Sequence, residues 1–502
     1  MKIVQSLWTK PLLNRKDGSY SRSNGGWLSE KDYLLALSYS SLKLKRHYPD
    51  VELVTDKKGK ELLIDMLGLP YSDCHICLDQ FNNLSPLMWV VPKVFSYSVV
   101  DTPFLHVDND VFIWGRFPRH IEVAELAVQN MEVNFDFYYD ALDYVKNFRH
   151  LPKYIASYKG RNDSVTSVNA GIIGGSDYDF YQEYISEVLE FLKMNKDFLN
   201  DNQVGKLTVI IDQFFFYSLA LEKNKKITPL IDTVSPDYLE ALAFYKTPIL
   251  SKFIHAVGGA KKDPLVSELV SQYLRYEFPE VYNTIEKIFA DHSYHLWAGG
   301  SSKSIPAPPV ESDSSLERES SGLESLQNVI ANIKNKKLRT NGAMEEIANL
   351  EQVISDFSTY NSSAVANDLW FKRFCEAQDI LTSCSLEELL NKKFVLAENH
   401  RVIELSFPLE NSQNNGADPE NSHQDQYIYL MRFNKKNKFE ATLLSDLKIL
   451  LYYFSEGPIA GNEIIEMLKE DYGDELSADK IRDMVFTLIS QSLLYDNSLS
   501  PV

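Results

Sequence analysis

The chain of 502 residues is 44% hydrophobic and 24% charged, which supports two or more packed domains and excludes a chain that is disordered throughout. Its formal net charge of −19 argues against nucleic acid as the main partner, because phosphate backbones bind basic surfaces. Four cysteines cannot form a disulfide scaffold, no apolar run approaches the roughly 20 residues of a membrane span, and the first residues do not resemble a secretory signal, so we expect a cytoplasmic protein.

Strands and helices alternate along the first third of the chain. We expect strands at 3–8, 51–55 and 102–107, and helices at 31–48, 61–67 and 89–99, with Ser29 capping the first of these helices. Strands separated by helices predict βαβ units and a mainly parallel sheet flanked by helices. In such α/β sheets, ligands bind beyond the carboxyl ends of the strands.

The same pattern continues to about residue 297. An extended stretch at 167–173, an apolar segment at 209–221, a strand at 253–257 and helices at 178–194 and 263–289 belong to it. We therefore expect one α/β domain over 1–297.

The composition changes after residue 297. Residues 298–322 are dense in Gly, Ser and Pro, which predicts a flexible linker. Amphipathic helices at 323–357 and 364–380 predict a helical accessory region over 323–410. A strand at 426–433, helices at 443–454, 462–472 and 478–491, and an apolar end at 493–495 predict a small α+β domain over 426–502.

The strongest local signal is Asp108-Asn109-Asp110, which follows apolar residues at 104–107. Residues i and i+2 on extended backbone project to the same side, so the two carboxylates can face one cation. Mg²⁺ takes oxygen ligands, of which one or two come from carboxylates and the rest from water and substrate phosphates. Such an ion would allow an acidic protein to bind a nucleotide diphosphate. Asp177-Tyr178-Asp179 has the same spacing at an expected helix start, so an ordinary turn stays open as the alternative.

Two later segments place polar residues or glycines in apolar surroundings. Asn169, Gly171 and Gly174 lie in 168–175, where the backbone comes close to a ligand or turns after a core strand. Asp212 and Gln213 interrupt the apolar segment at 209–221. Buried polar groups need partners, so these two residues bind a sugar hydroxyl, or Asp212 caps a helix.

A third segment sets His255 after apolar residues and before two glycines and the lysines Lys261 and Lys262. A neutral imidazole can ligate a metal, and a lysine can neutralise a phosphate. The alternative for a single histidine is a core residue with its hydrogen bonds satisfied. Cys74-His75-Ile76-Cys77 lacks the second pair of ligands that a structural zinc site needs.

The order of these segments resembles glycosyltransferases of the GT-A fold, over about residues 1–295. The resemblance implies a Rossmann-like α/β half that binds a nucleotide sugar, UDP- or GDP-linked, and an Asp-x-Asp that holds Mn²⁺ or Mg²⁺. It implies Asp108, Asp110 and His255 as metal ligands, and Asn169 and Asp212 as catalytic residues near the sugar or acceptor. The residues that it implies in contact with substrate or nucleotide are Trp8, Lys93, Asn109, Gly171, Gly174, Gln213, Lys261 and Lys262.

The stereochemical outcome stays open at this point. An inverting enzyme needs a carboxylate base to deprotonate the acceptor, and Asp212 is the candidate. A retaining enzyme needs no such base, and Asp212 would then orient the sugar.

The C-terminal residues 426–502 resemble the PqqD-like winged helix, a small domain that binds leader peptides of ribosomally made natural products. The resemblance implies a peptide recruited as the acceptor. DNA is a poor alternative, because residues 440–502 hold twelve acidic and four basic side chains. Two other functions remain open: a glycosyltransferase of glycan or small-molecule biosynthesis with a structural tail, and a non-catalytic binding protein of the same fold.

Overall fold

The structure is a computed structural model that describes residues 1–13, 24–100, 103–149, 151–199, 203–231, 251–290, 365–396, 400–405, 427–433, 439–443, 450–472 and 494–496, together with Thr247, Gln352, Arg482, Met484, Val485, Leu488 and Ile489. It divides into two compact units, Met1–Ala243 with Ser251–Ser302, and Phe244–Leu250 with Lys303–Val502. The expected linker at 298–322, nearly all of the expected helix at 323–357 and most of that at 478–491 lie outside the described residues.

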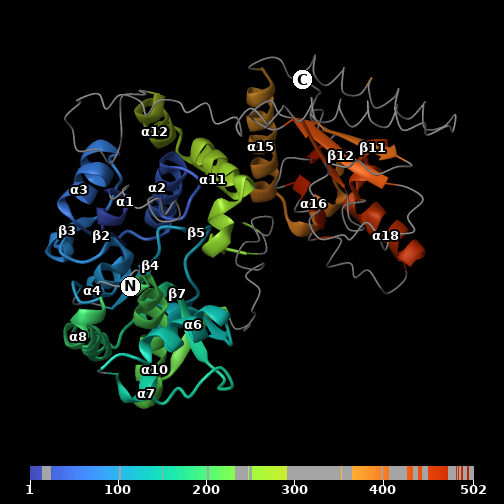
Figure 1. Cartoon of the computed structure of the whole chain (residues 1–502). Coiled ribbons are helices and arrows are strands. Elements are labelled where there is room, and N and C mark those ends of the chain that lie inside the picture. Colours follow the sequence, from blue (N-terminus) through green and yellow to red (C-terminus); the bar gives the residue numbers. More distant parts are fainter. Residues whose placement is uncertain are drawn as a thin grey trace, which may run out of the picture. The chain divides into compact units, whose positions relative to one another are not determined.

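A seven-stranded sheet forms the centre of the first unit (Figure 1). Its order is β3 (Asp73–Ile76), β2 (Val51–Thr55), β1 (Lys2–Leu7), β4 (Phe104–Val107), β7 (Thr166–Gly175), β6 (Leu126–Val133) and β8 (Ile227–Ile231). Strand β1 pairs in parallel with β2 and β4, β2 with β3, and β6 with β8, whereas β7 is antiparallel to both of its neighbours. The sheet is mixed but mostly parallel and is flanked by helices, which confirms the expected fold class.

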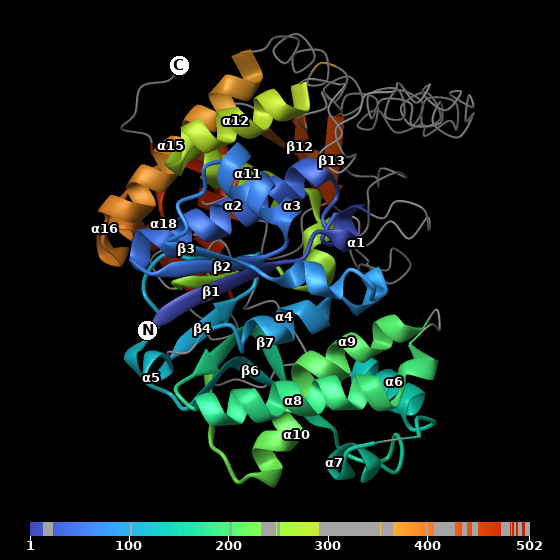
Figure 2. The same cartoon turned by 90° about the vertical axis from the view of Figure 1, so that its left-hand side faces the viewer.

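Alternating side chains of the strands build one core on each face of this sheet. Ile3 and Leu105 join the core that contains Leu44 of helix α2 (Glu30–His47). Their neighbours Val4 and Phe104 join the larger core, which contains α4 (Val90–Ser96). In Figure 2, α2 and α11 (Pro264–Glu277) lie on one side of β1–β3, and α4 lies on the other.

Helix α2 begins where the sequence predicts. The Ser29 side chain accepts a hydrogen bond from the backbone N–H of Asp32 at 3.1 Å, which satisfies one of the free N–H groups of the first turn. The helix ends at His47, shortly before Pro49, which cannot donate a backbone hydrogen bond.

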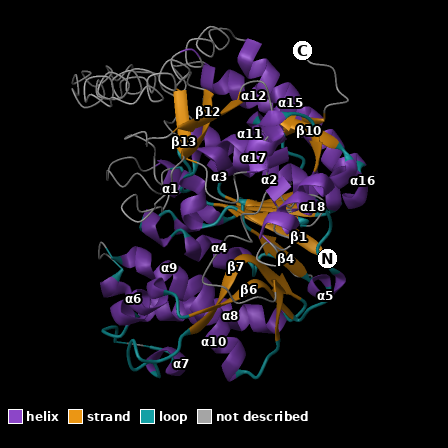
Figure 3. Ribbon diagram, turned by 90° about the vertical axis from the view of Figure 1, so that its right-hand side faces the viewer, coloured by secondary structure: helices purple, strands orange, loops and turns teal. Residues whose placement is uncertain are grey.

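Helices and single helical turns make up most of the rest of the first unit (Figure 3). In chain order they are α1 (Lys10–Leu13), α3 (Lys57–Lys60), a π-helix (Glu61–Met66), 3₁₀ turns (Leu78–Phe81, Pro86–Met88), α5 (Arg119–Glu122), α6 (Asp136–Val145), α7 (Lys153–Ala156), α8 (Tyr178–Met194), 3₁₀ turns (Lys196–Phe198, Val204–Lys206), α9 (Leu207–Val209), a π-helix (Ile210–Phe214), α10 (Phe215–Glu222), a 3₁₀ turn (Gly258–Lys262), α11 and α12 (Pro279–Ala290). A separate two-stranded sheet joins β5 (Val111–Ile113) to β9 (Phe253–His255).

Among the described residues, one helical run, Val204–Glu222, is long and apolar enough to cross a membrane. This finding corrects the expectation that no run approaches that length. Two thirds of its most apolar window (67%) is buried inside the structure, as in the core helix of a soluble protein.

The second unit contains two small antiparallel sheets. Strand β10 (Lys393–Leu396) pairs with β14 (Ile459–Ala460) and β15 (Leu494–Asp496), and β12 (Tyr427–Phe433) pairs with β11 (His400–Leu405) and β13 (Phe439–Leu443). Its described helices are α15 (Val365–Ser383), α16 (Leu386–Asn391), α17 (Leu450–Glu456) and α18 (Gly461–Tyr472). The division predicted between residues 410 and 426 does not separate these strands, because β10 and β11 pair with strands that follow it.

Several elements differ from the sequence expectation. Strands β3, β5, β6, β8, β10, β11, β13 and β14 were not expected. Of the helix expected at 443–454, the structure describes Leu443, which ends strand β13, and residues 450–454, which belong to α17. Strand β6 carries buried polar residues that interrupt its apolar pattern, and β8 contains Pro229. Both features disfavour a strand when the sequence is considered alone.

Candidate active site

The Asp-x-Asp motif lies at the carboxyl end of β4, in the turn that leads to β5. Val111, the first residue of β5, pairs with His255, the last residue of β9. The backbone N–H of Ala256 extends this pairing and donates to the Asp110 carbonyl oxygen at 3.0 Å. Antiparallel pairing thus brings His255 beside Asp110 from a distant part of the sequence.

Asp108, Asp110 and His255 form a group that fits a divalent ion. Each residue offers one ligand atom, and these atoms lie within 4.8 Å of one another. Asp110 Oδ1 is buried, lies 3.4 Å from His255 Nε2, and accepts no hydrogen bond from the described residues. Carboxylate oxygens are ligands of both Mn²⁺ and Mg²⁺, whereas an imidazole nitrogen is a ligand of transition metals, so this set of donor atoms suits Mn²⁺ better than Mg²⁺.

The hydrogen-bond network fixes which nitrogen of His255 faces Asp110. Gln129 Nε2 donates to Asn130 Oδ1 at 3.1 Å, which leaves Gln129 Oε1 at 2.7 Å from His255 Nδ1. A carbonyl oxygen only accepts, so Nδ1 carries the hydrogen, and Nε2 of a neutral ring turns its lone pair toward Asp110. Metal-ligating histidines typically donate their second ring N–H in this way.

Two local features make room for this arrangement. The β6–β7 register shifts between Val128 and Asn130, and such a bulge re-aims the side chain of the intervening residue, Gln129. A Cβ atom on Gly171 would lie 2.5 Å from Nδ1 and Cε1 of His255, so only glycine allows the ring to approach β7 this closely. The expected close approach at Gly171 is therefore an approach to His255.

Lys93, on α4, sits beneath the Asp-x-Asp motif and is buried. Its Nζ lies 2.8 Å from Asp108 Oδ1, and it donates to Asp212 Oδ2 at 2.8 Å and to the Ala170 carbonyl at 3.1 Å. An ammonium group has three hydrogens, and these three acceptors use them. Lys93 lines the cavity as expected, but its hydrogens are directed to protein groups instead of a phosphate.

Asp212 is held by two partners. Its Oδ2 accepts from Lys93, and its Oδ1 accepts from the Tyr97 hydroxyl at 3.0 Å. Asp212 belongs to the π-helix Ile210–Phe214 and is buried. Both of its carboxylate oxygens therefore bond to groups of the protein itself. The predicted helix cap at Asp212 is not formed, because its side chain bonds to these two groups.

Burial and ion pairs shift the pKa values of the acidic groups in opposite directions. Burial raises the pKa of the Asp108 carboxyl to about 6, although Lys93 opposes the rise. Burial also acts to raise the pKa of Asp110, but the ion pair with Lys261 outweighs it and holds that pKa well below its usual range. Asp110 is therefore ionised at neutral pH, and Asp108 loses its proton in the mildly acidic range.

The two predicted lysines differ in their contacts. Lys261 is ion-paired with Asp110 Oδ2, and its Nζ lies 3.4 Å from the Gly25 carbonyl oxygen. Lys262 is exposed at the end of the 3₁₀ turn after β9. Both lysines line the cavity described below.

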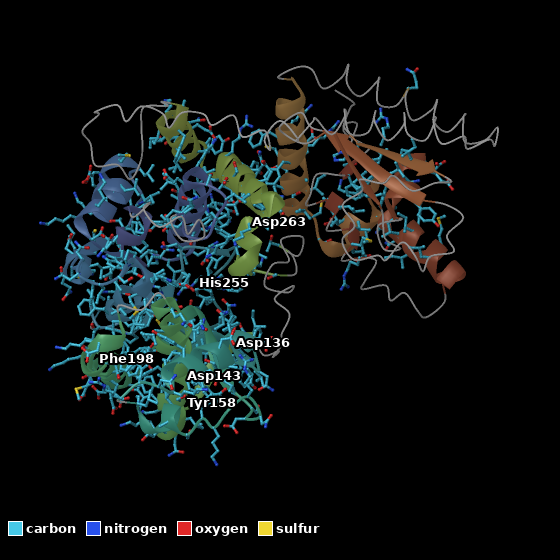
Figure 4. All side chains as sticks on the ribbon, viewed as in Figure 1. Asp136, Asp143, Tyr158, Phe198, His255 and Asp263 are labelled. Atoms are coloured by element: carbon cyan, nitrogen blue, oxygen red, sulfur yellow. The ribbon has the colours of Figure 1, made fainter. Side chains whose placement is uncertain are left out.

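A cavity of about 600 Å³ opens over these groups within the first unit. Figure 4 labels His255, the last residue of β9, which lines this cavity. Aromatic rings add apolar surface to the lining, from Trp8, Trp27, Tyr33, Trp89 and Phe137. Every predicted site residue except one lines this cavity, namely Trp8, Lys93, Asp108, Asn109, Asp110, Asn169, Gly171, Asp212, Gln213, His255, Lys261 and Lys262.

Gly174 is the exception. A Cβ atom at this position would lie 2.8 Å from Leu105 Cα, because β7 and β4 pair here. Gly174 is required by the packing of the sheet and does not line the cavity, which corrects its expected place in the substrate site.

Four further residues, which no sequence motif indicated, support the site: Tyr97, Gln129, Glu132 and Tyr138. Glu132 accepts a hydrogen bond from Asn169 Nδ2 at 2.9 Å, and Tyr138 contacts Gln213 Oε1 at 2.8 Å. A signal was present in Leu126–Val133, where Gln129, Asn130 and Glu132 interrupt an otherwise largely apolar segment. Buried polar side chains of this kind need partners, and here the partners are the site residues.

A second group of side chains satisfies the same distance criterion at the edge of the sheet. Glu52, Asp73 and His75 each offer one atom within 4.8 Å of the others. Lys2 Nζ lies 2.6 Å from Glu52 Oε1, and His75 Nε2 lies 2.9 Å from Glu52 Oε2. Lys2 therefore pairs with one carboxylate of this group, and none of its three residues lines the cavity.

Three solved structures to which the chain is similar are glycosyltransferases. They are GlyE of Streptococcus pneumoniae TIGR4 (12% identity, 59% of this chain and 65% of that chain, TM-score 0.29), the galactosyltransferase LgtC in complex with donor and acceptor sugar analogues (12%, 42% and 71%, 0.25), and the bifunctional glycosyltransferase WbbM (12%, 57% and 51%, 0.32). The chain spans less than two thirds of the length of GlyE and about half that of WbbM. Identities and TM-scores this low determine neither a donor nor an acceptor.

No curated protein matches the chain. The model of a family of unknown function, DUF6734, matches residues 1–288, which include all of the cavity-lining residues. This match covers more than half of the 502 residues but ends before the second unit, so the PqqD-like domain expected over 426–502 has no support from it. The chain therefore belongs to the DUF6734 family.

Proposed function

We propose that the chain is a metal-dependent glycosyltransferase that takes a sugar from a nucleotide-sugar donor. One observation carries the proposal: Asp108, Asp110 and His255 converge in a cavity of about 600 Å³ in a protein whose net charge is −19. A donor diphosphate is also negative, so the protein needs a cation where the two meet. The facing lone pairs of Asp110 Oδ1 and His255 Nε2 support a cation at that place.

The side chains around the proposed ion have separate tasks. A bound Mn²⁺ or Mg²⁺ would stabilise the negative charge that develops on the leaving diphosphate. Lys261 and Lys262 add positive charge beside it. Trp8 and Asn109 lie at the ends of β1 and β4, where the nucleoside would bind beyond the carboxyl ends of parallel strands.

The engagement of Asp212 favours retention of configuration at the sugar carbon. The carboxylates among the described cavity-lining residues are Asp108, Asp110 and Asp212. The first two are proposed metal ligands, and both oxygens of the third accept hydrogen bonds from Lys93 and Tyr97. An inverting enzyme needs a carboxylate base that can take the proton of the acceptor. Each Asp212 oxygen keeps a second lone pair, but an ammonium or a hydroxyl group already holds that oxygen, which favours an orienting role over that of a base. We therefore propose that Asp212 orients the sugar and that the enzyme retains configuration.

The contacts proposed so far account for binding of the nucleotide-sugar donor in the cavity. The acceptor is a peptide recruited through residues 426–502, or a glycan or small molecule. Removal of the second unit tests whether that unit takes part in donor hydrolysis. The proposal includes a cytoplasmic location.

The test is hydrolysis of UDP- and GDP-sugars by the full chain with and without Mn²⁺. We expect hydrolysis that requires Mn²⁺ and is lost in Asp110→Asn, because this change removes a charged ligand but keeps the side-chain shape. The matched control is Asp179→Asn, which changes an exposed residue of the other Asp-x-Asp sequence, at the start of α8. Anomeric analysis of the product by NMR then tests retention.

The outcomes separate the proposal from its rivals. Undiminished hydrolysis in Asp110→Asn would reject the metal site. Binding of nucleotide sugar without any turnover, seen by calorimetry, would identify a non-catalytic binding protein. An inverted product would reject the role proposed for Asp212.

A further inference from the structure

The hydroxyl of Tyr138 lies among three oxygen atoms, one of which belongs to the cavity-lining residue Gln213. It is 2.6 Å from Glu132 Oε2, 2.8 Å from Gln213 Oε1 and 3.2 Å from the Val168 carbonyl oxygen. Tyr138 and Glu132 are fully buried, whereas Gln213 is half-buried and lines the cavity. A hydroxyl carries one hydrogen, so it cannot donate to all three oxygens at once.

The orientation of Asn169 helps to decide which oxygen receives that hydrogen. The backbone N–H of Gly171 donates to Asn169 Oδ1 at 2.9 Å, so the other end of this amide must be its nitrogen. That nitrogen donates to Glu132 Oε1 at 2.9 Å. Glu132 is thus an acceptor on one oxygen, and its other oxygen, Oε2, faces the Tyr138 hydroxyl at 2.6 Å.

The short contact of 2.6 Å assigns the Tyr138 hydrogen to Glu132, because charge-assisted O–H···O⁻ bonds are the shortest and strongest of the three possibilities. The Tyr138 oxygen then faces Gln213 as an acceptor. Two oxygens at 2.8 Å with no hydrogen between them repel each other. The oxygen and nitrogen of a side-chain amide are interchangeable by a half-turn, so Nε2 of Gln213 takes the position beside Tyr138 and donates to it.

We propose that Glu132 and Tyr138 are positioning residues that hold the amide of Gln213 with its carbonyl oxygen toward the cavity. This inference rests on the glycosyl transfer proposed above. The chain of donors runs from Gln213 Nε2 to the Tyr138 oxygen, and from the Tyr138 hydroxyl to Glu132. The same carboxylate holds Asn169, so one buried group orients two of the predicted site residues.

The orientation has a consequence for recognition. A carbonyl oxygen accepts hydrogen bonds and cannot donate them. At this point of the cavity the sugar must therefore present a donor, such as a hydroxyl group, and an analogue that lacks the donor leaves the Gln213 oxygen without a partner.

The test compares two neighbouring tyrosines on α6. Tyr138→Phe removes the hydroxyl that links Gln213 to Glu132. Tyr139→Phe is the matched control, because the Tyr139 hydroxyl contacts Asn134 Oδ1 at 2.8 Å and the Asp163 carbonyl at 2.9 Å, neither of which lines the cavity. Glu132→Gln is a second variant that keeps the side-chain shape and removes the charge.

We expect kcat for Mn²⁺-dependent donor hydrolysis to fall about 10- to 100-fold in Tyr138→Phe and in Glu132→Gln, the range for losing a hydrogen bond to a charged group. The Kd for Mn²⁺ should stay within about threefold of the wild type, since neither Glu132 nor Tyr138 is a proposed metal ligand, whereas the donor KM rises to the extent that the Gln213 oxygen binds the sugar before the reaction. Tyr139→Phe should keep the wild-type kcat. A general structural defect would instead weaken Mn²⁺ binding together with the loss of kcat.

The outcomes distinguish this inference from the proposed function. Absence of Mn²⁺-dependent hydrolysis in the wild type rejects the proposed function and this inference with it. Hydrolysis in the wild type with equal kcat values in the two tyrosine variants rejects this inference alone. A wild-type kcat in Glu132→Gln does the same, and so does a parallel loss of kcat and Mn²⁺ affinity in both buried-pair variants.

Discussion

Gly171→Ala tests whether His255 holds the metal ion. The added Cβ atom would lie 2.5 Å from Nδ1 and Cε1 of the His255 ring and closer still to Oε1 of Gln129, the acceptor that orients this ring. Non-bonded carbon atoms normally approach to about 3.5–4.0 Å. The ring must therefore retreat by about 1 Å. Metal–ligand distances are held to about ±0.2 Å, so a retreat of this size removes His255 from the ion. We expect the Mn²⁺ affinity to fall about 10- to 100-fold, which corresponds to about 1.4–2.8 kcal/mol.

The assay is isothermal titration of the metal-free protein with Mn²⁺, with thermal unfolding recorded in parallel to show that the variant folds. Gly259→Ala is the matched control, since it changes another cavity-lining glycine at which the new Cβ atom would have no neighbour within 4 Å. Wild-type Mn²⁺ affinity in Gly171→Ala would refute the assignment of His255 as a ligand. Equal losses in the two glycine variants would show that the effect does not come from the ring.

Three further predictions concern the same site. In calorimetric titrations, Mn²⁺ affinity should fall about tenfold between pH 7 and pH 5. Burial raises the Asp108 pKa to about 6, so the carboxyl gains a proton below that pH and is lost as a ligand. An Mn²⁺ affinity that does not change over this pH range contradicts the prediction. Gln129→Met should lower Mn²⁺ affinity about tenfold or more, since it removes the acceptor that orients His255, whereas Gln80→Met, at an exposed glutamine, should not. A chain that ends at Ser302 should keep Mn²⁺-dependent donor hydrolysis, because the cavity lies in the first unit; loss of hydrolysis in a folded truncation would show that the second unit takes part.

Sequence patterns reveal the parts of the site that are local. Asp108 and Asp110 follow an apolar strand directly, so the strand pattern and the motif predict their position together. The convergence of His255 with them depends on the pairing of β5 with β9, and β5 has only three residues. A strand this short gives no periodic pattern, so only the resemblance to a family suggested that His255 belongs with the two aspartates.

The contacts that a charged residue makes are harder to predict than its location. Lys93 was expected beside the donor, and it does line the cavity. Its ammonium group instead bonds to Asp108, Asp212 and the Ala170 carbonyl. The sequence cannot show this, because the π-helix that carries Asp212 packs against α4 only in the folded chain. The reason for a glycine at position 174 likewise becomes clear only from the pairing of β7 with β4.

Strand β6 connects the stability of the first unit with its proposed chemistry. Gln129, Asn130 and Glu132 are all buried on this strand, and a buried polar group without a partner costs about 1–3 kcal/mol. Gln129 bonds to His255, while Glu132 bonds to Asn169 and Tyr138, so groups of the proposed site offset this cost. Packing alone would favour apolar residues at these positions, since β6 has β7 and β8 on its two sides. The polar residues are explained if β6 is the strand that orients the ligands of the ion and the amides around the sugar, at some expense of stability.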